Sequence, residues 1–200
     1  MIAALWTACC ALHSAMICEP VTRRLKQRLG DRFRYYRLVF NLVAAATFIP
    51  VGLYTASVAG DPVFRRDGPA LLAIRYGLLA CAVALFVAGG MHYSLGQFVG
   101  LSQLRRASSG GIARGGRIDS TGILALVRHP WYTATVLLVW AQDMDAVGLT
   151  VNAVLTVYVV VGTLLEEHKL VSEFGDAYRD YQRRVSMFLP FKWLSARVSG

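Results

Sequence analysis

A charged segment that contains a proline stands at the start of an apolar stretch in the last third of the chain. Arg128, His129 and Pro130 follow one another in LVRHPWYTA, residues 126–134. Proline disfavours helical geometry at the preceding residue and has no N–H, so the backbone groups around it need other partners. Together with arginine and histidine, such groups could bind a carboxylate. The simpler alternative is that Arg128 extends to lipid headgroups and Pro130 only begins a helix.

Two adjacent carboxylates, Glu166 and Glu167, follow the apolar run LTVNAVLTVYVVVGTLL. They could mark a membrane boundary, but acidic residues this close to a membrane segment are also candidates for a site. If the segment after Pro130 and this run form a helical hairpin, Arg128 and the two glutamates return to the same membrane face. A zwitterionic ligand would suit that arrangement, with its carboxylate on arginine or histidine and its ammonium on a glutamate.

Aromatic residues follow the proline directly. Tyr132 lies four residues after Arg128, close to one helical turn, and together with Trp131 it could stack on a planar base. An aromatic belt at the membrane interface is the alternative. A metal site is not expected, because no CxxC or HxxxH spacing occurs among the histidines and cysteines (His13, His92, His129, His168, Cys9, Cys10, Cys18, Cys81).

The elements that must position these residues are membrane helices. The chain has 200 residues, of which 56% are hydrophobic and 16% charged, and each bilayer crossing needs about 20 apolar residues. The formal charge of +9 comes from short basic blocks between apolar runs, a pattern typical of cytoplasmic loops rather than of nucleic-acid binding. We therefore expect an all-α integral membrane protein with about five transmembrane helices.

These helices should form a single membrane domain, 1–200. Residues 1–98 are expected to hold three helices, with a basic cytoplasmic loop at 19–37 and a kink at Pro50. Residues 99–122, rich in glycine and serine, are expected to be a flexible cytoplasmic loop. Residues 123–200 would form the hairpin and a short cytoplasmic helical tail. The first arm of the hairpin, Trp131 to Ala141, would rise only about 16 Å.

The tail carries one apolar stripe at helical spacing (Leu170, Phe174, Tyr178, Tyr181, Val185). Gly175 is expected to separate two short helices within it. The stripe should pack on the membrane face of the protein or on the loops beside it.

The same segments resemble a known family of membrane-embedded methyltransferases. This family includes isoprenylcysteine carboxyl methyltransferase, phospholipid methyltransferases and methanethiol S-methyltransferase, together with the related NnrU-like proteins. The resemblance rests on GILALVRHPWY at 122–132, LLEEHKLVSEFGDAYRDYQRRV at 164–185 and the proline of MFLP. The N-terminal ALHSAMICEPVTRRLKQRLGDRFRYYRLVFN is similar to the methanethiol methyltransferase and NnrU-like branch. One departure is Ser186, where many relatives have proline, and it concerns the geometry of the tail.

The resemblance implies S-adenosylmethionine bound at the cytoplasmic face of a multi-pass protein of the bacterial inner membrane. The cofactor contacts that it implies come from both segments (Arg128, His129, Pro130, Tyr132, Glu166, Glu167). Transfer from a sulfonium to a small thiol or lipid-soluble acceptor depends on orientation and exclusion of water more than on a metal. A thiol must also lose its proton, and a nearby basic residue would favour the thiolate; Arg184 and Arg183 are the candidates for this role.

Three functions from different classes are compatible with the sequence. The first is this methyltransferase, the second a non-enzymatic NnrU-like accessory or transport protein, and the third a haem-binding membrane protein with a Soret band. The polar residues inside the first apolar runs, His13, Ser14 and Asn41, could contact an acceptor or only hydrogen-bond neighbouring helices. In each case the lipid bilayer is an expected partner and nucleic acid is not.

Overall fold

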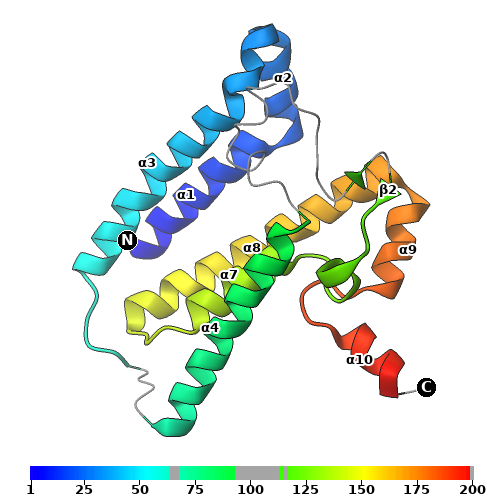
Figure 1. Ribbon diagram of the computed structural model, residues 1–200. Helices are drawn as coiled ribbons and strands as arrows, with labels where there is room; N and C mark the ends of the chain where they lie inside the picture. The colour runs from blue at the N-terminus through cyan, green and yellow to red at the C-terminus, as the bar shows by residue number, and fades with distance from the viewer. Residues whose placement is uncertain (64–67, 93–112, 115–116, 199–200) are drawn as a thin grey trace. The chain divides into compact units, whose positions relative to one another are not determined.

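The computed structural model describes residues 1–63, 68–92, 113–114 and 117–198 (Figure 1). Within these ranges the regular elements are helices, apart from a short antiparallel hairpin of β1 Ala113–Arg114 and β2 Arg117–Ile118, in which Ala113 lies opposite Ile118. The described residues divide between two compact units. One takes them from Met1–Arg65 and Asp143–Tyr158, and the other from Arg66–Tyr93, Gly110–Gln142 and Val159–Gly200.

The first unit is built on two helices joined by a basic connection. The helix α1 Ile2–Ile17 is followed by α2 Glu19–Leu29, the 3-10 helix η1 Gly30–Tyr35 and α3 Tyr36–Ser57. Gly30 ends α2 with a positive φ of 51°, which glycine adopts at no steric cost. The helix α3 continues through Pro50 to Ser57. The indole N–H of Trp6 donates to Thr55 Oγ1 at 2.9 Å and ties α1 to α3.

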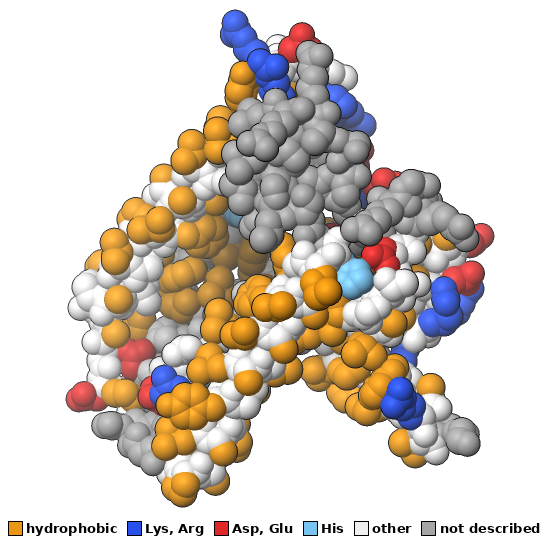
Figure 2. Space-filling view, in the orientation of Figure 1, with side chains coloured by type: hydrophobic (Ala, Val, Ile, Leu, Met, Phe, Trp, Pro, Cys, Tyr) orange, Lys and Arg blue, Asp and Glu red, His pale blue; other side chains and the backbone are white. Residues whose placement is uncertain are grey.

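The basic segment lies at one end of α3. Figure 2 shows Lys and Arg side chains over α2 and hydrophobic side chains along α3. Every Lys and Arg of α2 is exposed (Arg23, Arg24, Lys26, Arg28). This separation of charged and apolar surface is the pattern expected of a helix at a membrane interface followed by a membrane helix.

The second unit contains the pair of helices that carries the proline segment. The helix α4 Pro69–Gly90 packs along α7 Pro130–Trp140 (Figure 1). A Cβ atom on Gly89 would lie 2.5 Å from the Trp131 ring, so only glycine permits this close approach. The indole N–H of Trp131 donates to Phe86 O at 3.1 Å. Between the β hairpin and α7 lies the 3-10 helix η2 Gly122–Ala125.

The long helix α8 Ala146–Phe174 contributes to both units, with the change at Val159. As expected, Gly175 separates it from the next helix, α9 Asp176–Arg184, and adopts a φ of 57°. A last helix, α10, spans Phe191–Val198. The predicted stripe is the core of this region, because Tyr178, Tyr181 and Val185 form a buried cluster against Leu170 and Phe174.

Among the described residues, three helical segments are long and apolar enough to cross a membrane: Glu19–Ser57, Pro69–Gly90 and Ala146–Phe174. Only 6%, 6% and 22% of their apolar windows are buried inside the protein, which leaves apolar surface for lipid. The helices α1, with 16 residues, and α7, with 11, are shorter. The chain is therefore an all-α integral membrane protein, and the count of five crossings stays a prediction.

Most of the predicted flexible loop at 99–122 falls outside the described residues. The part that is described includes β1, β2 and the first residue of η2. The flexible loop therefore stays a prediction.

Candidate functional site

The proline segment is an extended piece of backbone held by the C-terminal tail. Pro130 is the first residue of α7 and is fully buried, as the simpler interpretation of this proline predicts. The N–H groups of Arg128 and His129 donate to Ser186 O at 2.9 Å and Met187 O at 3.1 Å. The expectation that this break leaves backbone groups for a ligand is therefore wrong for these two N–H groups, since the tail pairs with both.

Arg128 lies at the centre of a buried polar cluster. Its Nε donates to Glu167 Oε1 at 2.6 Å, and the exposed fractions of the two side chains are 6% and 7%. Its Nη1 donates to Gln182 O at 3.2 Å and makes a shorter bond to Val185 O. One guanidinium thus joins α7, α8 and the end of α9, and the predicted meeting of Arg128 with Glu167 is present.

Glu167 collects further donors from two helices. His129 Nε2 lies 3.0 Å from Glu167 Oε1, and the Tyr178 hydroxyl lies 3.4 Å from the same oxygen. Gln182 Nε2 donates to the other oxygen, Oε2, at 2.9 Å. A buried carboxylate with a cation and several donors is stabilised in its charged form. Arg128 and Glu167 therefore neutralise one another inside the protein.

A second, more open layer lies beside this pair. The Tyr132 hydroxyl donates to Glu166 Oε2 at 2.8 Å, and 37% of Tyr132 and 35% of the Glu166 side chain are exposed. The rings of Tyr132 and His129 are stacked, with centroids 5.5 Å apart. His129 Nδ1 lies 4.0 Å from Glu166 Oε2. Tyr132 and Glu166 form the exposed edge of the cluster, and His129, only 3% exposed, lies buried beneath them.

The tail closes the cluster from the other side. The Tyr181 hydroxyl donates to Leu124 O at 2.6 Å. Burial raises the pKa of the Tyr181 and Tyr178 hydroxyls above the usual range of tyrosine. Ser186 forms a parallel bridge with Val127, and its Oγ accepts the N–H of Lys192 at 3.0 Å. The serine that departs from the family pattern therefore has defined contacts in the tail.

The structure does not bring Arg183 and Arg184 into this cluster. Both are exposed on α9, where Arg183 pairs with Asp180 and Arg184 Nε donates to Asp180 O. An exposed arginine is surrounded by water, which screens its charge. Their role in lowering the pKa of a thiol stays a prediction.

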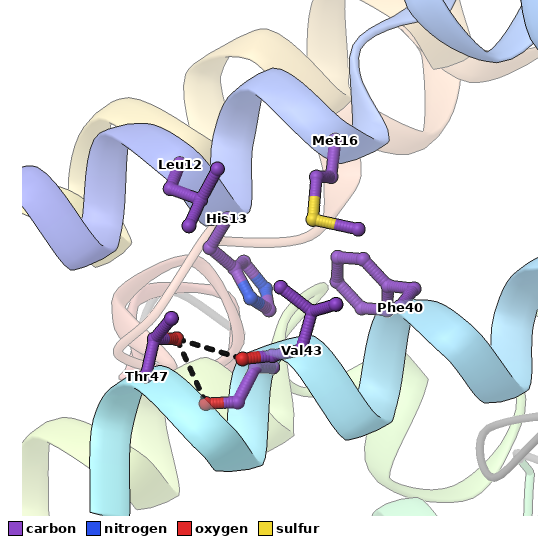
Figure 3. Close-up of a pocket in the computed structure, with 7 residues that line it drawn as sticks. Leu12, His13, Met16, Phe40, Val43 and Thr47 are labelled. Carbon is purple, nitrogen blue, oxygen red and sulfur yellow. Dashed lines mark hydrogen bonds between the residues drawn. The ribbon is translucent and has the colours of Figure 1, made fainter. Parts of the chain in front are cut away.

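The other polar candidates, His13, Ser14 and Asn41, belong to the first unit. Figure 3 shows the His13 ring between α1 and α3, beside a small hollow that Met16, Phe40, Val43 and Thr47 also line. The hollow leaves no room for a water molecule. Ser14 hydrogen-bonds the side chain of Tyr158. The predicted hydrogen bond to a neighbouring helix is thus present for Ser14, whereas His13 contacts its neighbours through its ring. Whether these residues contact an acceptor stays a prediction.

Three side chains that form polar contacts in this unit were not among the predicted site residues: Tyr178 and Gln182, which bond Glu167, and His92, which bonds Asp119. Tyr178 lay in the predicted stripe, and Gln182 is four residues later on the same helical face, so the spacing contained a signal for both. The third, His92, pairs with Asp119, and nothing in the spacing of these two residues indicates a contact. Among the residues that the structure describes, no group of three His, Cys, Asp or Glu could hold a metal ion.

Comparison with known proteins gives several relatives with one activity in their names. Methanethiol S-methyltransferase 1 of Bradyrhizobium diazoefficiens is 37% identical over 97 residues, 48% of this chain and 34% of that protein. Methanethiol S-methyltransferase of Pseudomonas deceptionensis is 46% identical over 66 residues, 32% of this chain and 25% of that protein. The same enzyme of another Pseudomonas is 32% identical over 137 residues, 64% of this chain and 50% of that protein.

The chain thus matches half or less of the length of these relatives. No solved structure matches it significantly. A family model described as NnrU protein matches residues 1–189, nearly the whole chain. The chain belongs to the NnrU protein family.

Proposed function

We propose that this chain is a membrane-embedded methyltransferase that transfers a methyl group from S-adenosylmethionine to a small thiol. The observation that carries the proposal is the partly exposed edge formed by Tyr132 and Glu166, which lies over the buried side chains of His129, Arg128 and Glu167. The names of the relatives support the thiol as acceptor.

The residues of the exposed edge fit this cofactor. Its amino-acid end carries an ammonium, for which Glu166 offers a carboxylate with 35% of its side chain exposed. Its base is planar, and the exposed Tyr132 ring, stacked on His129, offers a flat surface. Arg128 and Glu167, which we expected to touch the cofactor, would instead hold this edge in position.

Methyl transfer requires that the cofactor and the acceptor are aligned and that water is excluded from the site. When bound, the cofactor supplies an electrophilic methyl group on a sulfonium. Glu166 would fix the position of the cofactor, and the apolar helices around the site would exclude water that competes with the acceptor. On this view residues 123–200 hold the cofactor, and residues 1–98 and the lipid bilayer deliver the acceptor.

Calorimetry with S-adenosylhomocysteine on the purified protein in detergent tests the binding step. Glu166→Gln should weaken binding about 10- to 100-fold, since a hydrogen bond to a charged group contributes about 1.5–3 kcal/mol. Glu173→Gln, which removes the same charge from an exposed position of the same helix, should bind as the parent does. No heat with the parent protein, or equal losses in both variants, would count against the proposal.

A transfer assay with a labelled methyl group tests the acceptor. Methanethiol, larger thiols, a prenylcysteine and an aminophospholipid are compared as acceptors on the full chain in lipid. We expect label on the small thiols. Cofactor binding without transfer to any acceptor would favour the non-enzymatic NnrU-like accessory function instead.

A further inference from the structure

A histidine and an aspartate outside the polar cluster form a pair of their own. His92 lies just after α4, and its Nδ1 is 2.9 Å from Asp119 Oδ2. The other carboxylate oxygen accepts the N–H of Thr121 at 3.1 Å and its hydroxyl at 2.7 Å. These bonds from Thr121 and His92 lower the pKa of Asp119 to about 2. The carboxylate is therefore fixed in position and ionised at neutral pH.

The pair defines which nitrogen of His92 carries the proton. An ionised carboxylate only accepts hydrogen bonds, so Nδ1 must be the N–H donor in the neutral imidazole. Nε2 is then left with a lone pair, which is the form of histidine that accepts a proton. The same division of roles operates wherever a carboxylate orients a histidine for catalysis.

Gly122 packs closely against the edge of the His92 ring that carries this nitrogen. A Cβ atom on Gly122 would lie 2.7 Å from His92 Nε2 and 3.2 Å from Cε1. The glycine also has a φ of 53°, a conformation that other residues rarely adopt. Both the backbone and the close contact thus require glycine, because any side chain there would displace the ring from Asp119. The His92 side chain remains 18% exposed in this position.

The pair is joined to the candidate site on two sides within the second unit. Three residues before His92, Gly89 touches Trp131, the neighbour of Tyr132. On the other side, Gly122 begins η2, whose Leu124 carbonyl accepts the hydroxyl of Tyr181 in the core of the tail. The structure therefore offers a proton acceptor in the unit that holds the proposed cofactor site, where Arg183 and Arg184 offer none.

We propose that His92, oriented by Asp119, is the general base that takes the proton of the acceptor thiol, an inference that rests on the proposed function. The S–H proton moves to His92 Nε2 as a sulfur lone pair forms the new bond to the methyl carbon. The bond from that carbon to the sulfonium breaks, and its electron pair stays on the leaving sulfur. The products are a methyl thioether, a neutral S-adenosylhomocysteine and an imidazolium, which returns its proton to water.

A comparison of two thiols separates this role from a structural one. His92→Asn keeps a side-chain N–H for Asp119 but has no base, so its kcat for methanethiol should fall about 10²- to 10⁴-fold. An arenethiol that is already a thiolate at the assay pH should keep most of its rate, because it has no proton to lose. His168→Asn, an exposed histidine of α8, is the matched control and should resemble the parent with both thiols.

Two outcomes of this assay overturn the inference. An unchanged rate with methanethiol would show that His92 takes no proton, and an equal loss with both thiols would show a structural role. In either case transfer by the parent protein would leave the proposed function standing. If the parent methylates no thiol at all, the proposed function and this inference fall together.

A measurement without cofactor or turnover tests the orientation. Nitrogen NMR of the imidazoles in the full chain should show His92 with its proton on Nδ1. Asp119→Asn should increase the share of the other tautomer, because an amide can also donate to Nδ1. A parent protein with the proton of His92 on Nε2 would overturn the assigned role.

Discussion

Two histidines, one in each unit, have contrasting surroundings. His129 lies in the polar cluster, stacked on Tyr132 and hydrogen-bonded to Glu167. His13 lies among the rings of Phe40, Phe48 and Tyr158, with centroids 4.6, 5.8 and 6.1 Å away. Its Nδ1 is buried and has no hydrogen-bond partner among the described residues. One histidine is part of a network and the other behaves as an aromatic ring.

The polar groups of the protein thus have two kinds of environment, a hydrogen-bonded network around His129 and aromatic packing around His13. In the cluster every charge has a partner, so removing one partner leaves another group buried and unpaired. Around the His13 ring the contacts are aromatic packing, so removing its unpaired nitrogen leaves no other polar group without a partner. Substitutions should therefore have large effects in the first region and small ones in the second.

The largest effect is expected for Glu167→Gln. The change leaves the Arg128 guanidinium, 6% exposed, without its counter-charge. Loss of one partner of a buried ion pair costs about 3–5 kcal/mol. The unfolding midpoint in detergent should fall clearly, whereas Glu173→Gln on the exposed surface should leave it within a degree or two. Equal midpoints for the two variants would mean that the cluster is not the rigid part of the protein.

An intermediate effect is expected at Asp119 and depends on pH. Hydrogen bonds from Thr121 and His92 lower its pKa to about 2 from an ordinary value of 3.8. The carboxylate therefore stabilises the fold fully above about pH 4, and this contribution is lost as the pH falls toward 2. The difference in unfolding free energy between the parent and Asp119→Asn should shrink over that range. A difference that stays constant would contradict the assignment.

The smallest effect is expected for His13→Phe. Replacing the imidazole by a phenyl ring keeps the aromatic contacts and removes a buried nitrogen that has no partner. The free energy of unfolding should change by less than about 1 kcal/mol, toward greater stability. His129→Phe is the matching change in the cluster and should be strongly destabilising. A large loss in His13→Phe would show that this region also depends on a polar contact.

Local sequence patterns predicted the long helices and the two segments that meet in the polar cluster. Apolar runs predicted α3, α4 and α8, and the spacing of the tail stripe predicted the core around Tyr178 and Tyr181. The hairpin interpretation places Arg128 and Glu167 at the same membrane face, and the two side chains do meet. Each of these predictions rests on local patterns that repeat at the helical period.

The rest depends on contacts that local patterns do not contain. Nothing in LVRHPWYTA indicates that its backbone pairs with Ser186 and Met187. Nor does the spacing of His92 and Asp119 indicate a contact, because the two residues are 27 positions apart and follow different elements, α4 and β2. The sequence also suggested that Arg128 and Glu167 face a ligand, but two opposite charges that are buried together satisfy each other first.

The dependence of Arg128 on the tail has a consequence for biosynthesis. Arg128 meets Glu167 across 39 positions and Val185 across 57 positions of the chain. The ribosome therefore delivers the arginine to the membrane surface before it has made the groups that neutralise it. Insertion of the helices and assembly of the cluster are two separate events in the life of the protein. A nascent chain that is stopped between them would be anchored in the membrane and still lack its site.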